Sequence, residues 1–346
     1  MSTERGRIRI SGFDSDRVER REPLSEWSEA DQTETKSRWV RAVERFRRNR
    51  SAMIGLGVVT LMALLALFAR PVVVGGVTVQ PFSLAPYDPN MILRLQPEYD
   101  VGRYASPSLA HPMGTDGSGR DLFSRVIYGG RYSISIGFVV VLLTASVGMI
   151  YGGISGYYGG RVDEIMMRIL DTIFAFPGLV LALIIVAMFG GGFWQLVLAF
   201  SLFGWASYAR LLRGEVLKVK QNEYVLAAKA LGARDRSVIF RHVVPNALAP
   251  VVVQATLSVG TVVIGVAALG FLGVGLDPGT AEWGTMLDET RDTLIRGPDG
   301  AIPCWATVYP GMAIFLFVIA MNLVGDGIND ALDAQDTDEV DPGGGV

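Results

Sequence analysis

Long stretches without a charged residue constrain this chain more than any other feature. They are Ser51–Ala69, Tyr132–Gly160, Thr172–Ala209, Val243–Leu276 and Gly300–Gly325. A bilayer core about 30 Å thick requires about 20 residues of helix at 1.5 Å each. Of all residues 50% are apolar and only 19% are charged, below the ~25% of an average soluble protein. The chain is therefore predicted to be an all-α integral membrane protein.

One of these stretches is too long for a single span. Thr172–Ala209, written as one helix, would run about 57 Å. Gly190, Gly191 and Gly192 lie near its middle, and three consecutive glycines favour a turn over a helix interior. Dividing the stretch there predicts about six transmembrane helices in total.

Basic residues directly before the first span predict the topology. The segment 36–50 is rich in arginine and contains a single acid, Glu44. Basic flanks remain in the cytoplasm, so both termini of a six-span chain are predicted to be cytoplasmic. The basic loop 210–241 and the acidic loop 277–306 agree with this topology. The arginines between residues 70 and 131 conflict mildly with this topology, because they would lie outside the cytoplasm. Long loops, however, translocate largely regardless of charge.

These patterns divide the chain into five parts. Residues 1–50 form a cytoplasmic segment, of which 1–35 are expected to be disordered and 36–50 to form a basic helix. That helix serves either as a binding site for anionic headgroups or as a simple topology anchor. The remaining parts are a first transmembrane helix (51–70), an extracytoplasmic loop (71–131), a five-helix core (132–330) and an acidic, disordered tail (331–346).

The loop 213–245, between the fourth and fifth spans, is longer than a simple connection requires. Asn222 is placed to cap a short helix, and Asp235 is placed to cap a second one. Gly232 suits a helix end that needs a left-handed residue. Ala227 and Ala228 make a thin helix wall that another protein can approach closely. The sequence predicts a helix, a sharp turn and a second helix at the cytoplasmic surface.

This loop resembles the cytoplasmic EAA motif of binding-protein-dependent ABC importer permeases. Ala227, Ala228, Gly232 and Pro245 match that pattern, whereas Leu226, His242 and Val244 replace its Glu, Ile and Leu. The dipeptide, oligopeptide and nickel permeases of the "C" subunit type match more closely, because this chain shares their typical residues at both ends of the loop. The resemblance assigns to an ATPase-coupling loop the residues Glu223, Tyr224, Ala227, Ala228, Gly232, Ala233, His242, Pro245 and Asn246.

A second motif of the same branch precedes the second span. It consists of Gly114, Thr115, Asp116, Gly119, Arg120 and Asp121. Together with His111, the two acids invite a metal interpretation, but their spacing fits no familiar site. Acids beside glycines serve well as turn and cap residues, so no metal is predicted, and the segment is expected to shape the outer surface near a binding protein. Further matching stretches are 156–160, 176–177, 270–273, 283–287 and 322–327.

The resemblance implies a type I ABC importer transmembrane-domain fold and a role as the permease subunit for peptides in the cytoplasmic membrane. It implies two ABC ATPase subunits at the cytoplasmic face, a homologous "B"-type permease and an extracytoplasmic solute-binding protein. No Walker A sequence occurs in the chain, so ATP hydrolysis is assigned to the partners. No catalytic residue, cofactor or nucleic acid is expected.

Other functions stay open at this stage. The same importer class carries nickel chelates or oligosaccharides. A secondary transporter would explain the spans but not the loop 213–245. A membrane enzyme would need a catalytic set at bilayer depth, whereas both histidines, His111 and His242, are predicted to lie at the surface. The substrate-lining residues are not readable from the sequence.

Overall fold

A computed structural model of the protein describes residues 38–294 and 302–338. The predicted disorder of residues 1–35 and the end of the predicted tail, 339–346, lie outside the described residues. Within these described ranges, five helices are long and apolar enough to cross a membrane. They are α4 (Arg50–Phe68), α5 (Leu122–Tyr158), α8 (Phe193–Val219), α11 (Val244–Phe271) and α13 (Trp305–Asp338). The basic segment 36–50 contains α3 (Arg38–Arg48).

The third predicted span is a bent pair of helices and not one straight helix. α6 (Gly160–Phe174) and α7 (Gly178–Phe189) meet at an angle of 76°, and they bring the number of spans to six if the pair counts as one. Pro177 lies at the bend and lacks the N–H that would continue the helix of α6. It also disfavours helical geometry at Phe176. α7 alone is only about 18 Å long, too short to cross the hydrocarbon core.

The helix of the second span, α5, begins ten residues before the charge-free stretch, so the end of the predicted loop 71–131 is helical. Asp121 caps α5, because its carboxylate accepts a hydrogen bond from the Ser124 N–H at 2.8 Å. Arg131 is tolerated inside the helix because its guanidinium donates to the carbonyls of Leu67 (2.8 Å), in the last turn of α4, and of Arg70 (2.6 Å), just beyond it. The rest of the loop carries a hairpin of β1 (Val72–Val74) and β2 (Val77–Gln80) and the short helix η1 (Leu93–Leu95).

The predicted tail also differs from the structure at its start. α13 continues to Asp338, so residues 331–338 are helical where disorder was expected. Ala331, Leu332 and Ala334 are good helix formers, and the first proline or glycine after them is Pro342.

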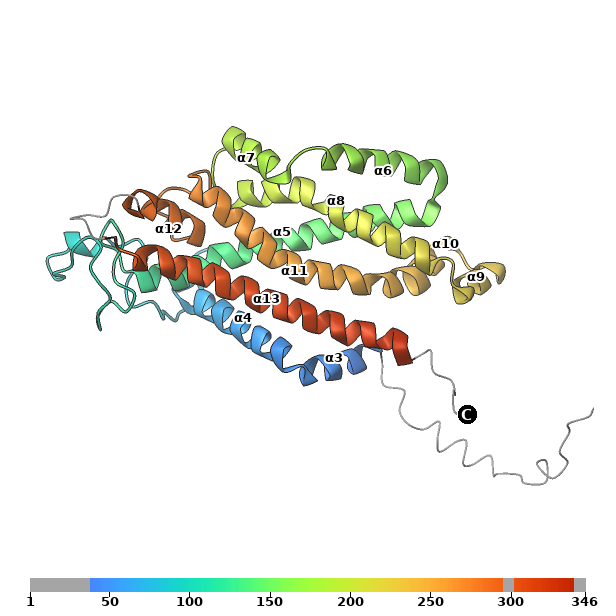
Figure 1. The fold of residues 1–346 in the computed structure, drawn as a ribbon, viewed down its shortest axis with the longest axis horizontal. Coiled ribbons are helices and arrows are strands. Elements are labelled where there is room, and N and C mark those ends of the chain that lie inside the picture. The colour runs from blue at the N-terminus through green and yellow to red at the C-terminus, as the bar shows by residue number, and fades with distance from the viewer. Residues whose placement is uncertain (1–37, 295–301, 339–346) are drawn as a thin grey trace, which may run out of the picture. The chain divides into compact units, whose positions relative to one another are not determined.

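The long helices pack around shared apolar surfaces. α11 contacts α8 on one side and α13 on the other, and α4 packs along α13 (Figure 1). α6 and α7 lie along α8 in the same view. The pair α5 and α8 makes the most extensive helix contact in the described part of the chain. Glycine permits this approach, because a Cβ on Gly152 would lie 2.2 Å from the carbonyl oxygen of Ala209. Close packing, as expected for small residues between membrane helices, thus explains this glycine.

Short helices occupy the two ends of this bundle (Figure 1). At one end lie α9 (Glu223–Ala230) and α10 (Asp235–Val238), followed by a π-helical turn, η2 (Ile239–Val243). At the other end lie α12 (Trp283–Thr290), η3 (Arg291–Leu294) and the segment that joins α4 to α5. We refer to these as the α9 end and the α12 end.

Candidate functional site

The turn after α9 has the geometry that the sequence predicts. Gly232 has a φ of +79°, in the left-handed region that favours glycine. Its N–H donates to the carbonyl of Lys229 at 2.9 Å, and the Ala233 N–H donates to the carbonyl of Ala228 at 3.1 Å. These two bonds form a Schellman motif, which satisfies carbonyls at the helix end that would otherwise lack partners. Asn222 begins α9 through its backbone carbonyl, whereas its side chain makes no capping bond to the described helix.

Asp235 begins α10 but also attaches the loop to α5. One of its carboxylate oxygens accepts a hydrogen bond from the Tyr157 hydroxyl at 2.5 Å. The Lys229 ammonium lies 4.7 Å from the centre of the Tyr157 ring, a cation–π distance. One tyrosine at the end of α5 therefore contacts both α9 and α10. Its role was not assigned from the sequence, and the only signal was its place in the matching stretch 156–160.

The outer face of α9 is apolar and exposed. The exposed fractions are 44% for Tyr224, 53% for Leu226 and 89% for Leu231. Ala227 is exposed as well, and Ala228 is half-buried. Beneath this face, Val225 and Val238 are fully buried among residues of α8 and α11. The loop is thus anchored by its inner side while it presents aliphatic and aromatic side chains at the α9 end.

The remaining predicted residues of the loop lie close to this face. The His242 ring is half-buried and its centre lies 6.3 Å from that of Tyr224. The Asn246 amide donates to the carbonyl of His242 at 2.7 Å, and Pro245 lies in the first turn of α11. Glu223 is exposed at the start of α9, and Ala233 is half-buried after the turn.

A bidentate ion pair links the helices that support the loop. The Arg213 guanidinium of α8 donates to both oxygens of Asp163 in α6, at 2.7 and 2.6 Å. Asp163 also accepts a hydrogen bond from the Ser155 hydroxyl of α5 at 2.5 Å. Three helices thus meet at one carboxylate near the α9 end. Arg210 and Asp171 form a second pair at 2.8 Å, and both of their side chains are at least half exposed.

The motif 114–121 lies at the α12 end and forms a tight turn before α5. Gly114 (φ +74°) and Gly119 (φ +79°) both have left-handed geometry. Thr115 pairs with Asp121 as an isolated β-bridge. Asp116 accepts hydrogen bonds from the N–H groups of Ser118 (2.8 Å) and Arg120 (3.0 Å). The motif residues are therefore turn and cap residues, as expected.

Four charged side chains join this motif to α12, and we call them the ion-pair network: Asp116, Arg120, Arg125 and Glu289. Arg120 lies 2.7 Å from Asp116 and 2.7 Å from Glu289. Arg125, which is fully buried, lies 3.3 Å from Asp116 and 3.1 Å from Glu289. Both arginines also donate to the carbonyl of Gly279. Burial lowers the pKa of Arg120, but Asp116 and Glu289 outweigh it and raise that pKa above its ordinary value.

His111 lies outside the candidate membrane spans, in the segment between α4 and α5, and its side chain is buried there. Its exposed fraction is 5%, and its Nδ1 lies 2.8 Å from a carboxylate oxygen of Asp121. The other oxygen of Asp121 accepts from the Ser124 backbone and hydroxyl. The carboxylate that caps α5 thus also gives the histidine a buried partner. Among the described residues, no three His, Cys, Asp or Glu side chains lie together so as to hold a metal ion.

Comparison with known proteins agrees with this architecture. The profile of a family described as "Binding-protein-dependent transport system inner membrane component" matches residues 148–335. A second profile, the "N-terminal TM domain of oligopeptide transport permease C", matches residues 37–107.

Individual relatives match along most of the chain. The chain is 37% identical to the dipeptide transport system permease protein DppC of Alkalihalophilus pseudofirmus over 305 residues, 88% of this chain and 92% of that protein. It is 39% identical to the glutathione transport system permease protein GsiD of Shigella dysenteriae over 297 residues, 86% of this chain and 90% of that protein. A crystal structure of an amino acid ABC transporter with histidines aligns at 16% identity and a TM-score of 0.43, covering 62% of this chain and 94% of that one. That likeness is too distant to bear on the fold.

The helices and profiles define the class as a multi-pass inner membrane protein of a transport system. Within that class, the chain belongs to the family of binding-protein-dependent ABC transporter permeases, in the OppC-type branch. It is a permease subunit and not an enzyme. The transport systems of this family depend on a binding protein and an ATPase.

Proposed function

We propose that this chain imports short peptides as the "C"-type half of a pore, with both termini in the cytoplasm. The cargo is inferred from the relatives named for dipeptide and glutathione transport, since glutathione is itself a tripeptide. A homologous "B"-type permease would complete the pore. An extracytoplasmic binding protein would deliver the peptide at the α12 end, and two ATPase subunits would bind at the α9 end.

The exposed face of α9 carries the proposal that the loop 213–245 couples ATP hydrolysis to transport. Tyr224, Leu226 and Leu231 expose apolar surface on a segment that is anchored from behind by Val225 and Val238. Exposed apolar patches of this kind mark protein contacts. The small Ala227 beside them allows a partner to approach closely. Closure of the ATPases would displace this segment and, through it, the ends of α5 and α8.

The attachment of the loop to α5 through Tyr157 also supports the proposal that movement of α9 displaces the membrane helices. Asp235 of the loop and Tyr157 of α5 share a hydrogen bond, and Arg213 ties α8 to α6 nearby. A force applied to α9 therefore acts on three membrane helices together. Binding at one site then biases a two-state element at another, as allosteric coupling requires.

The experiment places a charge on the exposed face and measures assembly and import separately. Ala227→Glu is expected to abolish co-purification of the ATPase subunits and the uptake of a labelled dipeptide into proteoliposomes. The matched control is Ala110→Glu, which makes the same change at an exposed alanine of the segment between α4 and α5. Retention of both ATPase binding and uptake by Ala227→Glu would contradict the coupling role. Uptake of nickel chelates or oligosaccharides in place of peptides would contradict the proposed cargo.

A further inference from the structure

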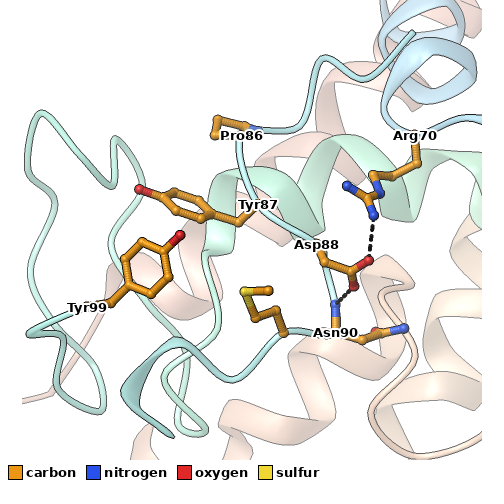
Figure 2. Close-up of a pocket in the computed structure, with 7 residues that line it drawn as sticks. Arg70, Pro86, Tyr87, Asp88, Asn90 and Tyr99 are labelled. Carbon is orange, nitrogen blue, oxygen red and sulfur yellow. Dashed lines mark hydrogen bonds and ion pairs between the residues drawn. The ribbon is translucent and has the colours of Figure 1, made fainter. Parts of the chain in front are cut away.

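An open pocket of about 550 Å³ lies in the segment between α4 and α5, outside the loop and the motif already described. Figure 2 shows its lining: the rings of Tyr87 and Tyr99 lie together on one side, and Arg70 reaches toward Asp88 on the other. The ring centres are 5.6 Å apart at an angle of 85°. Pockets of 300–1,000 Å³ are the usual size for small ligands. The pocket is thus large enough for a short peptide.

The charged side of the pocket consists of one ion pair with exposed partners. The Arg70 guanidinium lies 2.7 Å from the Asp88 carboxylate, and their side chains are 35% and 39% exposed. The second oxygen of Asp88 accepts a hydrogen bond from the Asn90 N–H at 2.9 Å, which holds the carboxylate in place. A partly exposed pair of this kind contributes little to stability. The two side chains can therefore separate and pair with the charged groups of a ligand at a small cost in free energy.

The loop that carries Tyr87 and Asp88 is attached to the start of α5 and to His111. The Tyr87 N–H donates to the Ser124 hydroxyl of α5 at 3.1 Å. The carbonyl of Pro89 accepts a hydrogen bond from the buried Arg125 at 3.1 Å. The Tyr87 ring also packs on His111, with ring centres 5.0 Å apart. These contacts preorganise the loop that carries Tyr87 and Asp88, and preorganisation lowers the cost of binding.

The chemistry of the lining selects a ligand that carries both charges. An arginine binds a carboxylate through two parallel N–H donors, and a pocket that holds a carboxylate on one side and two tyrosine rings on the other suits an ammonium group. Burial, with help from Asp121 and Tyr99, raises the pKa of Tyr87, so its phenol stays protonated and able to donate. Pro86 and Met91 add apolar lining for a side chain. A net-neutral pocket with these groups fits a zwitterion better than a singly charged ligand.

We propose that this pocket binds the free termini of a short peptide, with Arg70 at the α-carboxylate and Asp88 at the α-ammonium group. The inference rests on the proposed import of peptides and adds a receiving site on the "C"-type subunit itself. It also gives Ser124 and Arg125 at the start of α5 a role, since they hold the loop that carries Tyr87 and Asp88. A side chain of the binding protein is the competing occupant, and the test below separates the two.

The test measures equilibrium binding to the assembled permease–ATPase complex in nanodiscs, without the binding protein. The probes are labelled alanyl-phenylalanine and the same dipeptide with its termini acetylated and amidated. We expect the free dipeptide to bind saturably and the blocked one at least ten-fold more weakly. Asp88→Asn and Tyr99→Ala should each weaken binding of the free dipeptide at least ten-fold. The matched control, Arg94→Gln, changes an exposed arginine of the same segment that donates to the carbonyl of Ser118, and it should bind like the wild type.

Three results would overturn the inference. One is equal binding of the free and blocked dipeptides, and another is wild-type binding by both pocket variants. The third comes from a separate titration of the same complexes with the binding protein: loss of its docking in Asp88→Asn while peptide binding is unchanged would assign the pocket to the partner protein. Import of peptide by the complete wild-type system is read separately. If import proceeds while the pocket binds nothing, the proposed receiving site is refuted, whereas the proposed import of peptides is not.

Discussion

Arg125 of α5 and Glu289 of α12, 164 residues apart in the chain, lie 3.1 Å apart at the α12 end of the bundle. Arg125 has no exposed side-chain surface, whereas Glu289 keeps 22% of its own. The pair therefore closes a long loop of the chain through a contact that is largely withdrawn from solvent.

Replacing Arg125 should destabilise the protein strongly. Arg125→Met leaves Asp116 and Glu289 with Arg120 as their remaining cation, and removing one partner of a buried pair costs about 3–5 kcal/mol. The free energy of unfolding, measured by titration with sodium dodecyl sulfate, should fall by about that amount. The matched control is Arg291→Met, because Arg291 is half exposed and lies 3.6 Å from Asp288. It should change the free energy by less than about 1 kcal/mol, and an equal loss in both variants would refute the role of burial.

Two nearly isosteric substitutions at Gly232 should separate backbone strain from docking. A Cβ at Gly232 meets no atom within 4 Å, and both Asn and Asp tolerate left-handed geometry. Gly232→Asp should abolish transport while membrane insertion stays intact, because it adds a charge to the proposed docking surface. Gly232→Asn should retain most of the uptake. Normal uptake by Gly232→Asp would contradict the assignment of the coupling loop.

Neighbouring glycines of α5 should respond in opposite ways to the same methyl group. Gly152→Ala places a Cβ against the backbone of Ala209, and overpacking of this kind costs about 1–3 kcal/mol. Gly153→Ala meets only a methyl group of Leu212 at 3.7 Å and should stabilise the helix by about 0.5–1 kcal/mol. Unfolding free energies of the two variants check the difference. Similar values for both would show that α5 and α8 are less closely packed than the contact at Ala209 indicates.

Removing one hydroxyl should loosen the coupling loop. Tyr157→Phe deletes the donor to Asp235, and hydrogen bonds to charged groups contribute about 1.5–3 kcal/mol. Hydrogen exchange of the backbone amides in 223–238 should become faster, and uptake should fall. The adjacent Tyr158, whose exposed fraction is 59%, supplies the control Tyr158→Phe. Faster exchange in the control, or none in Tyr157→Phe, would contradict the attachment.

The sequence predicts the membrane helices well because the rule behind them is simple. A long apolar run has no alternative to helix in lipid, since every backbone polar group needs an internal partner. The turn at Gly232 is predicted equally well, because a glycine that follows a short alanine-rich helix commonly ends that helix in left-handed geometry. The positions of Gly114, Asp116 and Asp121 in a turn and a cap follow from the same kind of rule.

The errors arose where a charge finds its partner far away in the chain. Counting charge-free runs began the second span at Tyr132, because Arg125 and Arg131 look incompatible with a buried helix. Their partners are Glu289 in α12 and backbone carbonyls at the C-terminal end of α4, which no local pattern reveals. The pairing of His111 with Asp121 was not predicted for the same reason, since it depends on the folded turn. The break at Pro177 is predictable from the sequence, because a proline inside a long apolar run can kink or start a helix.

The contact of Gly152 with Ala209 has a mechanical consequence. Because backbone meets backbone there, α5 and α8 have little room to slide or roll past each other. Two helices joined in this way resist bending more than either does alone, and α8 by itself, with 27 residues, is about 40 Å long. In the proposed mechanism, a displacement of the segment held by Tyr157 would therefore move α5 and α8 together as one stiff unit, so that most of it would reach the α12 end.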